Sequence, residues 1–145
     1  MQAARVAEVA GFTKVATTNR YIVVVNVLPA ERMFTADEVA SEHPLEGELV
    51  LRGSANPVVG SGRHVEAHVY DRATGLPITA VTPSIQLSDL GSGAVIDVEP
   101  TLMQDLIIGA LDVHFGNNVV LDGGRDIRVV VDIGGEGVVI SGHLD

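Results

Sequence analysis

The chain has 145 residues, of which 46 % are hydrophobic, so it can build the packed core of one domain and is not a disordered polymer. Nineteen acidic residues against nine basic ones give a formal charge of −10, which opposes binding to nucleic acid and to anionic membrane surfaces. No cysteine is present, which excludes disulfides, zinc–thiolate sites, iron–sulfur clusters and thiol nucleophiles.

Short runs rich in β-branched residues, separated by turn residues, dominate the first half of the chain. Only 3 % of the residues are aromatic, so the core has to be aliphatic, and Val and Ile suit a pleated sheet. We expect an N-terminal arm or irregular first strand (1–20), a buried strand (21–28) ending before Pro29, one or two helical turns (35–43) with Thr35 as N-cap, and a strand (46–53).

The second half of the chain continues this pattern, with glycine-rich turns between strands. We expect a strictly alternating strand (63–71), a turn (71–75), and a strand segment (76–89) that its two prolines either place at a sheet edge or split into two pieces. A strand broken by Pro100 (94–103) follows, and then three strands within 117–144, separated by turns at 122–124 and 134–135. Strands at intervals of roughly 10 residues indicate a sandwich. The predicted fold is all-β, an immunoglobulin-like antiparallel β-sandwich, with residues 21–145 forming a single domain.

One alternating strand carries three potential metal ligands. In the hexapeptide HVEAHV, His64, Glu66 and His68 share one face, and the apolar residues between them face the core. Successive side chains on such a face are roughly 6.5–7 Å apart, so two of them can converge on one ion and further ligands must come from elsewhere. An exposed polar strand face is the alternative interpretation, since His and Glu are ordinary there.

Two further residues could complete such a site. His114 lies in DVHFGNN, where a glycine and two asparagines predict a shaped loop able to direct the imidazole toward a neighbouring sheet face; a turn with a solvated imidazole is the alternative. Met103 ends the strand at 94–103, and a thioether favours copper(I), although methionine is also common in cores. His43 and His143 are weaker candidates, one beside a proline and one next to the C-terminus.

The sequence contains none of the common catalytic motifs. There is no G-x-S-x-G elbow and no phosphate-binding P-loop, and the spacing H-x-E-x-H differs from the H-E-x-x-H signature of zinc proteases. A sandwich enzyme of the copper–zinc superoxide dismutase type needs about six histidines, whereas this chain has five. We therefore expect a protein that is not an enzyme.

Two fragments together, HVEAHVYD and HFGNNVVL, resemble the periplasmic iron-transport accessory proteins. That family comprises small immunoglobulin-like β-sandwich proteins encoded beside iron permeases and includes a treponemal membrane antigen. The resemblance extends over residues 60–133 and implies that His64, Glu66, Met103 and His114 bind a metal. Phe115 stands where the family has tyrosine, and His68, where close members tend to have an acidic residue, is a possible additional ligand.

The resemblance also implies a function, a location and an assembly. It implies an extracytoplasmic, homodimeric protein that binds copper or iron and serves a membrane iron permease. A signal sequence is not evident at the start of the chain, so the chain is either cytoplasmic or a mature form. The alternative function is an immunoglobulin-like protein-interaction module without metal.

Overall fold

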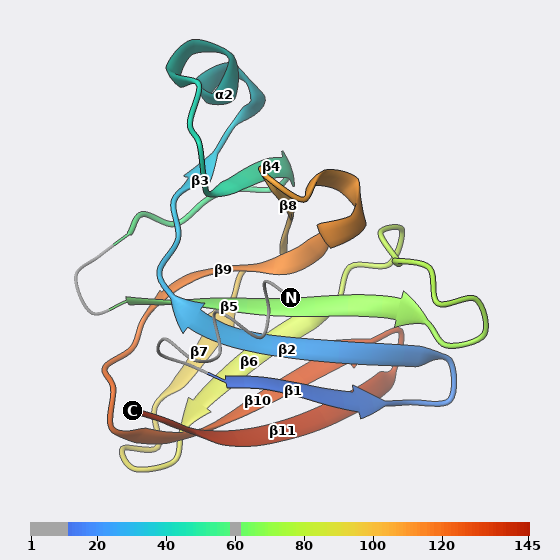
Figure 1. Cartoon of the computed structure of the whole chain (residues 1–145). Helices are drawn as coiled ribbons and strands as arrows, with labels where there is room; N and C mark the ends of the chain where they lie inside the picture. Colours follow the sequence, from blue (N-terminus) through green and yellow to red (C-terminus); the bar gives the residue numbers. More distant parts are fainter. Residues whose placement is uncertain (1–11, 59–61) are drawn as a thin grey trace.

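The computed structural model describes residues 12–58 and 62–145, and within them it contains eleven strands, one α-helix and one short 3-10 helix (Figure 1). The strands form two sheets that pack as layers of a sandwich, which confirms the predicted all-β fold. Most of the expected N-terminal arm, residues 1–11, lies outside the described residues. The rest of it forms a strand, Phe12–Thr17, that pairs along its whole length with the next strand.

The two sheets differ in size. The larger has seven strands, in the spatial order β1 (Phe12–Thr17), β2 (Tyr21–Pro29), β5 (Gly62–Asp71), β9 (His114–Val120), β8 (Thr101–Asp105), β4 (Glu48–Arg52) and β3 (Met33–Phe34). The smaller has four, in the order β11 (Glu136–Leu144), β10 (Arg125–Ile133), β6 (Ser84–Asp89) and β7 (Val95–Val98). All named pairs are antiparallel except β3 with β4.

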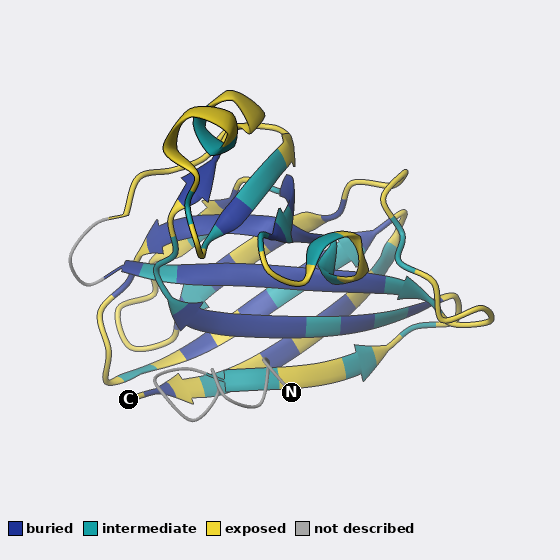
Figure 2. Ribbon diagram, turned by 45° about the horizontal axis from the view of Figure 1, so that its top comes forward, coloured by how far each residue is buried: buried dark blue, intermediate teal, exposed yellow. Residues whose placement is uncertain are grey.

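The core fills the space between the sheets with aliphatic side chains. Alternate residues of the central strands point into it, among them Val23, Val25 and Val27 of β2, Val65, Ala67 and Val69 of β5, and Ile127, Val129 and Val131 of β10. All nine are at most 2 % exposed. The prediction that the apolar residues of the alternating strand 63–71 face the core is therefore confirmed. The central strand β5 is buried along most of its length on both faces (Figure 2).

The predicted helix is confirmed over Ala36–Glu42, named α2. The Thr35 hydroxyl accepts a hydrogen bond from the backbone N–H of Glu38, and the Glu38 carboxylate accepts one from the backbone N–H of Thr35. This capping box fixes the first turn. His43 ends the helix in a left-handed conformation with φ 51°, so it serves as the C-cap, away from the histidines of β5.

One sequence prediction of local structure was wrong, and another was only partly correct. The segment around His114 is not a loop, because His114–Val120 form the regular strand β9, which pairs with both β5 and β8. The break predicted at Pro100 within the strand 94–103 is confirmed, but the two pieces, β7 and β8, belong to different sheets. The change of sheet at the proline places Met103 beside His114 in register.

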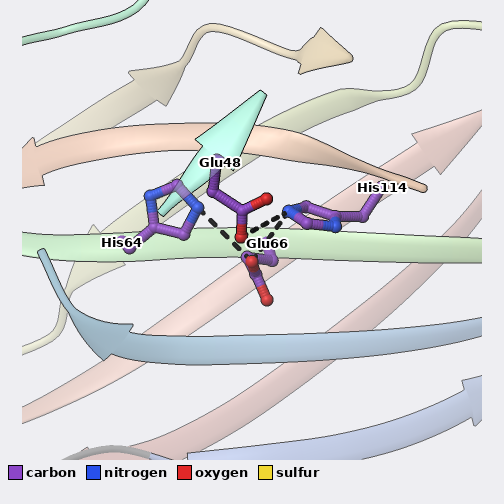
Figure 3. A group of neighbouring side chains, drawn as sticks. All are labelled: Glu48, His64, Glu66 and His114. Atoms are coloured by element: carbon purple, nitrogen blue, oxygen red, sulfur yellow. Dashed lines mark ion pairs between the residues drawn. The ribbon is translucent and has the colours of Figure 1, made fainter. Parts of the chain in front are cut away.

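The seven-stranded sheet is strongly curved. Its strands β8 and β4 turn away from the sandwich next to β9 (Figure 1), and Glu48 of β4 extends toward Glu66 on the outer face of β5 (Figure 3). β4 carries a register irregularity between Val50 and Arg52, a feature that increases bending and twist of a strand. The outer face of β5 is therefore covered.

Among the described residues, no helix is long and apolar enough to cross a membrane.

Candidate metal centre

Four buried side chains meet on the outer face of the large sheet, under the curved strands. His64 and Glu66 come from β5, His114 from β9 and Glu48 from β4 (Figure 3). Each offers one nitrogen or oxygen atom, and these four atoms all lie within 4.8 Å of one another. The four residues are 0–4 % exposed. The structure thus brings together three of the predicted site residues and adds Glu48.

Glu48 reaches the cluster because the sheet curls. β4 is three strands away from β5, which in a flat sheet is a separation of about 14 Å. In the curved sheet its Oε1 lies 3.5 Å from Nε2 of His114, whose strand pairs directly with β5. The curvature converts one face of a sheet into an enclosed cluster of potential ligands from three strands.

A hydrogen bond at Nδ1, on the side of the ring away from the cluster, fixes the orientation of the His64 imidazole. Its Nδ1 lies 2.9 Å from Oδ1 of Asn118, an amide oxygen that can only accept, so Nδ1 carries the proton. Nε2 faces the cluster, at 3.4 Å from Oε2 of Glu66 and 3.8 Å from Oε2 of Glu31. When the ring is neutral, Nε2 holds the lone pair, which is the arrangement of a metal-ligating histidine.

His114 has the same arrangement on the opposite side of Glu66. Its Nδ1 donates to the backbone carbonyl of Asp112 at 2.7 Å. Its Nε2 lies 2.8 Å from Oε2 of Glu66 and 3.5 Å from Oε1 of Glu48. Two imidazoles from different strands therefore present their Nε2 atoms to the same carboxylate oxygen.

The two oxygens of Glu66 have different surroundings. Oε1 accepts a hydrogen bond from the Asn26 side-chain amide at 3.1 Å and lies 3.3 Å from Nε2 of His68. Oε2 faces Nε2 of both His64 and His114. One oxygen thus anchors the carboxylate, and the other is directed between the two imidazoles.

Several polar atoms in this cluster are buried without a hydrogen bond. Among the described residues, they include Nε2 of His64, Nε2 of His114 and Oε2 of Glu48. The contacts of both nitrogens with Glu66 are short, but the geometry is not that of a hydrogen bond. Buried polar atoms are normally satisfied, because leaving one unpaired costs about 1–3 kcal/mol. A cation placed between these atoms would satisfy all of them.

Charge within the cluster shifts the pKa values in opposite directions. Burial alone would raise the pKa of Glu66, but the imidazolium of His114 and the contacts of His64 and His68 hold it well below its usual range. Burial opposes ionisation of His64 and His114, yet the Glu66 carboxylate outweighs it and raises the pKa of both, most strongly for His114. Burial raises the pKa of Glu48 to about 9. The carboxylate–imidazole contacts thus favour the protonated form of both histidines, and burial favours the neutral form of Glu48.

The remaining predicted ligands lie next to the cluster. Met103 is fully buried and pairs in register with His114, so both side chains are on the same face of the sheet. His68 is 5 % exposed, and its ring centroid lies 4.5 Å from that of His114. It contacts Oε1 of Glu66, whereas His64 contacts Oε2. The interpretation of the row on β5 as an exposed polar face was wrong, because all three side chains are buried.

The weaker histidine candidates lie elsewhere. His43 is the helix C-cap, and Nδ1 of His143 lies 2.7 Å from Oδ1 of Asp126 on the exposed side of the small sheet. Sequence reasoning missed Glu48, although it predicted a strand at 46–53. It also missed Glu31, whose Oε2 lies beside His64. A carboxylate in an alternating strand gives no signal of its own, since polar residues are expected on one face.

No protein-family model matches the sequence, and no curated protein is significantly similar to it. Solved structures show the same fold. A copper-bound variant of FetP from uropathogenic Escherichia coli is 17 % identical, with a TM-score of 0.58 over 85 % of this chain and 73 % of FetP. FetP expressed recombinantly in the E. coli periplasm is 16 % identical, with a TM-score of 0.56 over 85 % of this chain and 74 % of that protein. The chain therefore has a FetP-like fold.

Proposed function

We propose that the protein binds one transition-metal ion, copper or iron, between His64, Glu66, His114 and Glu48. The observation that carries the proposal is the convergence of two buried Nε2 atoms on one carboxylate oxygen without hydrogen bonds. The Nδ1 atom of each imidazole bonds to a protein oxygen on the far side of the ring, and such bonds orient histidines that bind metals through Nε2. Nitrogen and carboxylate donors suit divalent iron and copper.

Met103 and His68 have supporting roles in this proposal. Met103 lies opposite His114 and is the one thioether among the proposed donors, so it would favour copper(I) over iron. His68 holds the anchored oxygen of Glu66 and acts as a positioning residue for that ligand. Coordination by the Met103 sulfur would therefore make the site prefer copper(I) to iron.

The same arrangement supports a role in metal transport. The protein would be a distant member of the periplasmic iron-transport accessory proteins, located outside the cytoplasm and serving a membrane iron permease. The FetP-like fold and the copper bound to one FetP structure support this role. The protein would not be an enzyme, because the two imidazoles and both carboxylates are used as ligands and the cluster is closed over by β4.

The test is metal titration of purified protein and variants. His64→Ala and His114→Ala should each weaken copper(II) binding by about 10-fold or more, since each removes a ligand. Glu66→Gln keeps the shape and the anchoring contacts at Oε1 but removes the charge, and it should weaken binding as well. Elemental analysis of the parent protein would identify the bound metal.

Two histidine variants serve as controls. His143→Ala removes an exposed histidine that also pairs with a carboxylate, and His43→Ala removes a histidine side chain at the end of α2, where the capping hydrogen bond is made by the backbone. Both should bind copper as the parent does. If all variants bind copper equally, or if the parent binds none, the metal proposal is wrong and an interaction module without metal takes its place.

A further inference from the structure

Asn26 is a buried polar residue beside the cluster that is not among the proposed ligands. It lies on β2 directly opposite Glu66 in the register with β5, and it is 4 % exposed. Its side-chain nitrogen Nδ2 lies 3.1 Å from Oε1 of Glu66 and 3.3 Å from Nε2 of His68. The amide therefore contacts the carboxylate oxygen that does not face His64 and His114.

The chemistry of its partner fixes the orientation of this amide. A flipped amide would place its oxygen against Oε1 of Glu66, so that two acceptors would face each other in a buried site. Among the described residues, none donates to Oδ1 of Asn26, which is itself buried. Leaving such an oxygen unpaired costs about 1–3 kcal/mol, so the contacts made by Nδ2 are the interactions that account for an amide at this position.

His68 also contacts Oε1 of Glu66, but its neutral ring cannot make both of its contacts at once. With the proton on Nε2, the ring can donate to Oε1 at 3.3 Å but cannot accept from Asn26. With the proton on Nδ1, Nε2 can accept from Asn26 at 3.3 Å but cannot donate to Glu66. The hydrogen bond from Asn26 to Glu66 is compatible with both forms, so Asn26 is the constant donor to Oε1.

A carboxylate can bind an ion through one oxygen or through both. The hydrogen bond at Oε1 opposes the second mode, because it holds this oxygen toward Asn26. Oε2 then stays at 2.8 Å from Nε2 of His114 and 3.4 Å from Nε2 of His64. Together with one oxygen of Glu48, the cluster offers two nitrogens and two oxygens, a donor set that suits copper(II) in a tetragonal geometry.

We propose that Asn26 is a positioning residue that holds Oε1 of Glu66 away from the ion and so limits Glu66 to one metal-binding oxygen, Oε2. The proposal rests on the metal site proposed above. Asn26 does not touch the ion and acts through Glu66. Loss of its amide frees the carboxylate to rotate, and Oε1 can then join Oε2 at the ion.

The test compares Asn26→Leu and Asn26→Ala with the parent. Leucine removes the donor at similar size, and alanine removes it without adding bulk, so Asn26→Ala decides if leucine prevents folding. Both variants should bind copper(II) about 10-fold more weakly, as happens when a group that orients a ligand is lost. The electron paramagnetic resonance spectrum of bound copper(II) should shift in its g and hyperfine values, because the oxygen donors change. Crystal structures of the metal-free variants should show the Glu66 carboxylate rotated.

Thr101→Val is the matched control, because it removes another buried donor at constant size. The Thr101 hydroxyl donates to the carbonyl of Ser54, and the residue is 1 % exposed. This variant should be less stable but should keep the copper(II) spectrum of the parent.

The proposal is overturned if Glu66 keeps its orientation in both metal-free Asn26 variants, if their copper(II) spectra equal that of the parent, or if Thr101→Val shifts the spectrum equally. A parent that binds no copper, together with a rotated Glu66 in metal-free Asn26→Ala, would contradict the proposed function and still support the positioning role.

Discussion

Protons and a metal ion compete for the same atoms of the cluster. In the metal-free protein, the pKa values of His64 and His114 are raised by the Glu66 carboxylate, which favours protonated imidazoles, and burial raises the pKa of Glu48 to about 9. Imidazole must be neutral to bind a metal, so binding releases protons. Copper affinity should therefore increase with pH above about 6.5, the usual pKa of histidine.

The same protonation predicts how stability depends on pH. A group whose pKa is higher in the folded than in the unfolded chain stabilises the folded protein at pH values below its unfolded-state pKa. This contribution is lost as pH rises through the folded-state pKa. His64, His114 and Glu48 all act in this direction. The thermal midpoint of the metal-free protein, followed by circular dichroism in EDTA, should fall between about pH 6.5 and pH 9.

Copper should reverse this trend, because the ion replaces the protons and binds more tightly as pH rises. Glu48→Gln cannot release a proton and should show a shallower decrease in EDTA than the parent. A metal-free midpoint that is constant or rises over this range would contradict the assigned protonation. Glu66 acts in the opposite direction, since its lowered pKa contributes stability that is lost only as pH falls below about 4.5.

At the scale of elements, β9 connects the site to the loops that cover it. The Asn118 side-chain amide donates to the carbonyls of Glu31 and Asn56, at 2.6 and 3.1 Å. The Asn117 side chain donates to the carbonyl of Ser54 and accepts from the backbone N–H of Asn56. Two adjacent asparagines thus hold the chain on either side of α2 against the strand that carries His114.

Gly116 allows β9 to approach β5 closely. A Cβ atom at this position would lie 1.9 Å from the carbonyl oxygen of Val65, which no side chain can tolerate. Gly116→Ala should push the strands apart and destabilise the protein by about 1–3 kcal/mol or more, as overpacking does. Chemical denaturation measures this, and copper affinity should fall too because His114 moves away from Glu66.

Gly137→Ala is the matched control, since Gly137 also lies in a strand and an added Cβ would make only an ordinary contact, 3.6 Å from Asp132. Its free energy of unfolding should change by no more than about 0.5 kcal/mol. Equal stability of both variants would show that the close approach of β9 and β5 does not hold in solution.

The sequence predicts what is local and misses what depends on long-range geometry. Alternation placed His64 and Glu66 on one face, and the capping pattern placed α2. The glycine and asparagines after His114 suggested a loop because they are common turn residues, but here pairing with β5 and β8 outweighs that preference. Glu48 was not predictable, since its position depends on the curl of the sheet across three strands.

For the whole molecule, charge and exposed apolar residues bear on assembly. A charge of −10 per chain opposes self-association unless apolar area is buried or a metal is shared. Ile107, Ile108 and Leu111, beside or within the short helix Gly109–Asp112, are 68, 42 and 82 % exposed. The family resemblance and this apolar segment lead us to predict a homodimer.

Sedimentation velocity with and without copper tests this prediction. A dimer that dissociates when Ile107 and Leu111 are both changed to serine would place the interface at this segment. A dimer that persists in that variant would place the interface elsewhere. Only monomer at tens of micromolar, in either metal state, would contradict the prediction.

The central claim is that one ion binds between the two imidazoles. Crystals grown with copper and measured at the copper absorption edge test it most directly, through an anomalous difference map. We predict one strong peak about 2 Å from Nε2 of both His64 and His114, next to a carboxylate oxygen of Glu66. A map without a peak there, or with its only peak beside exposed His143 and Asp126, would contradict the account.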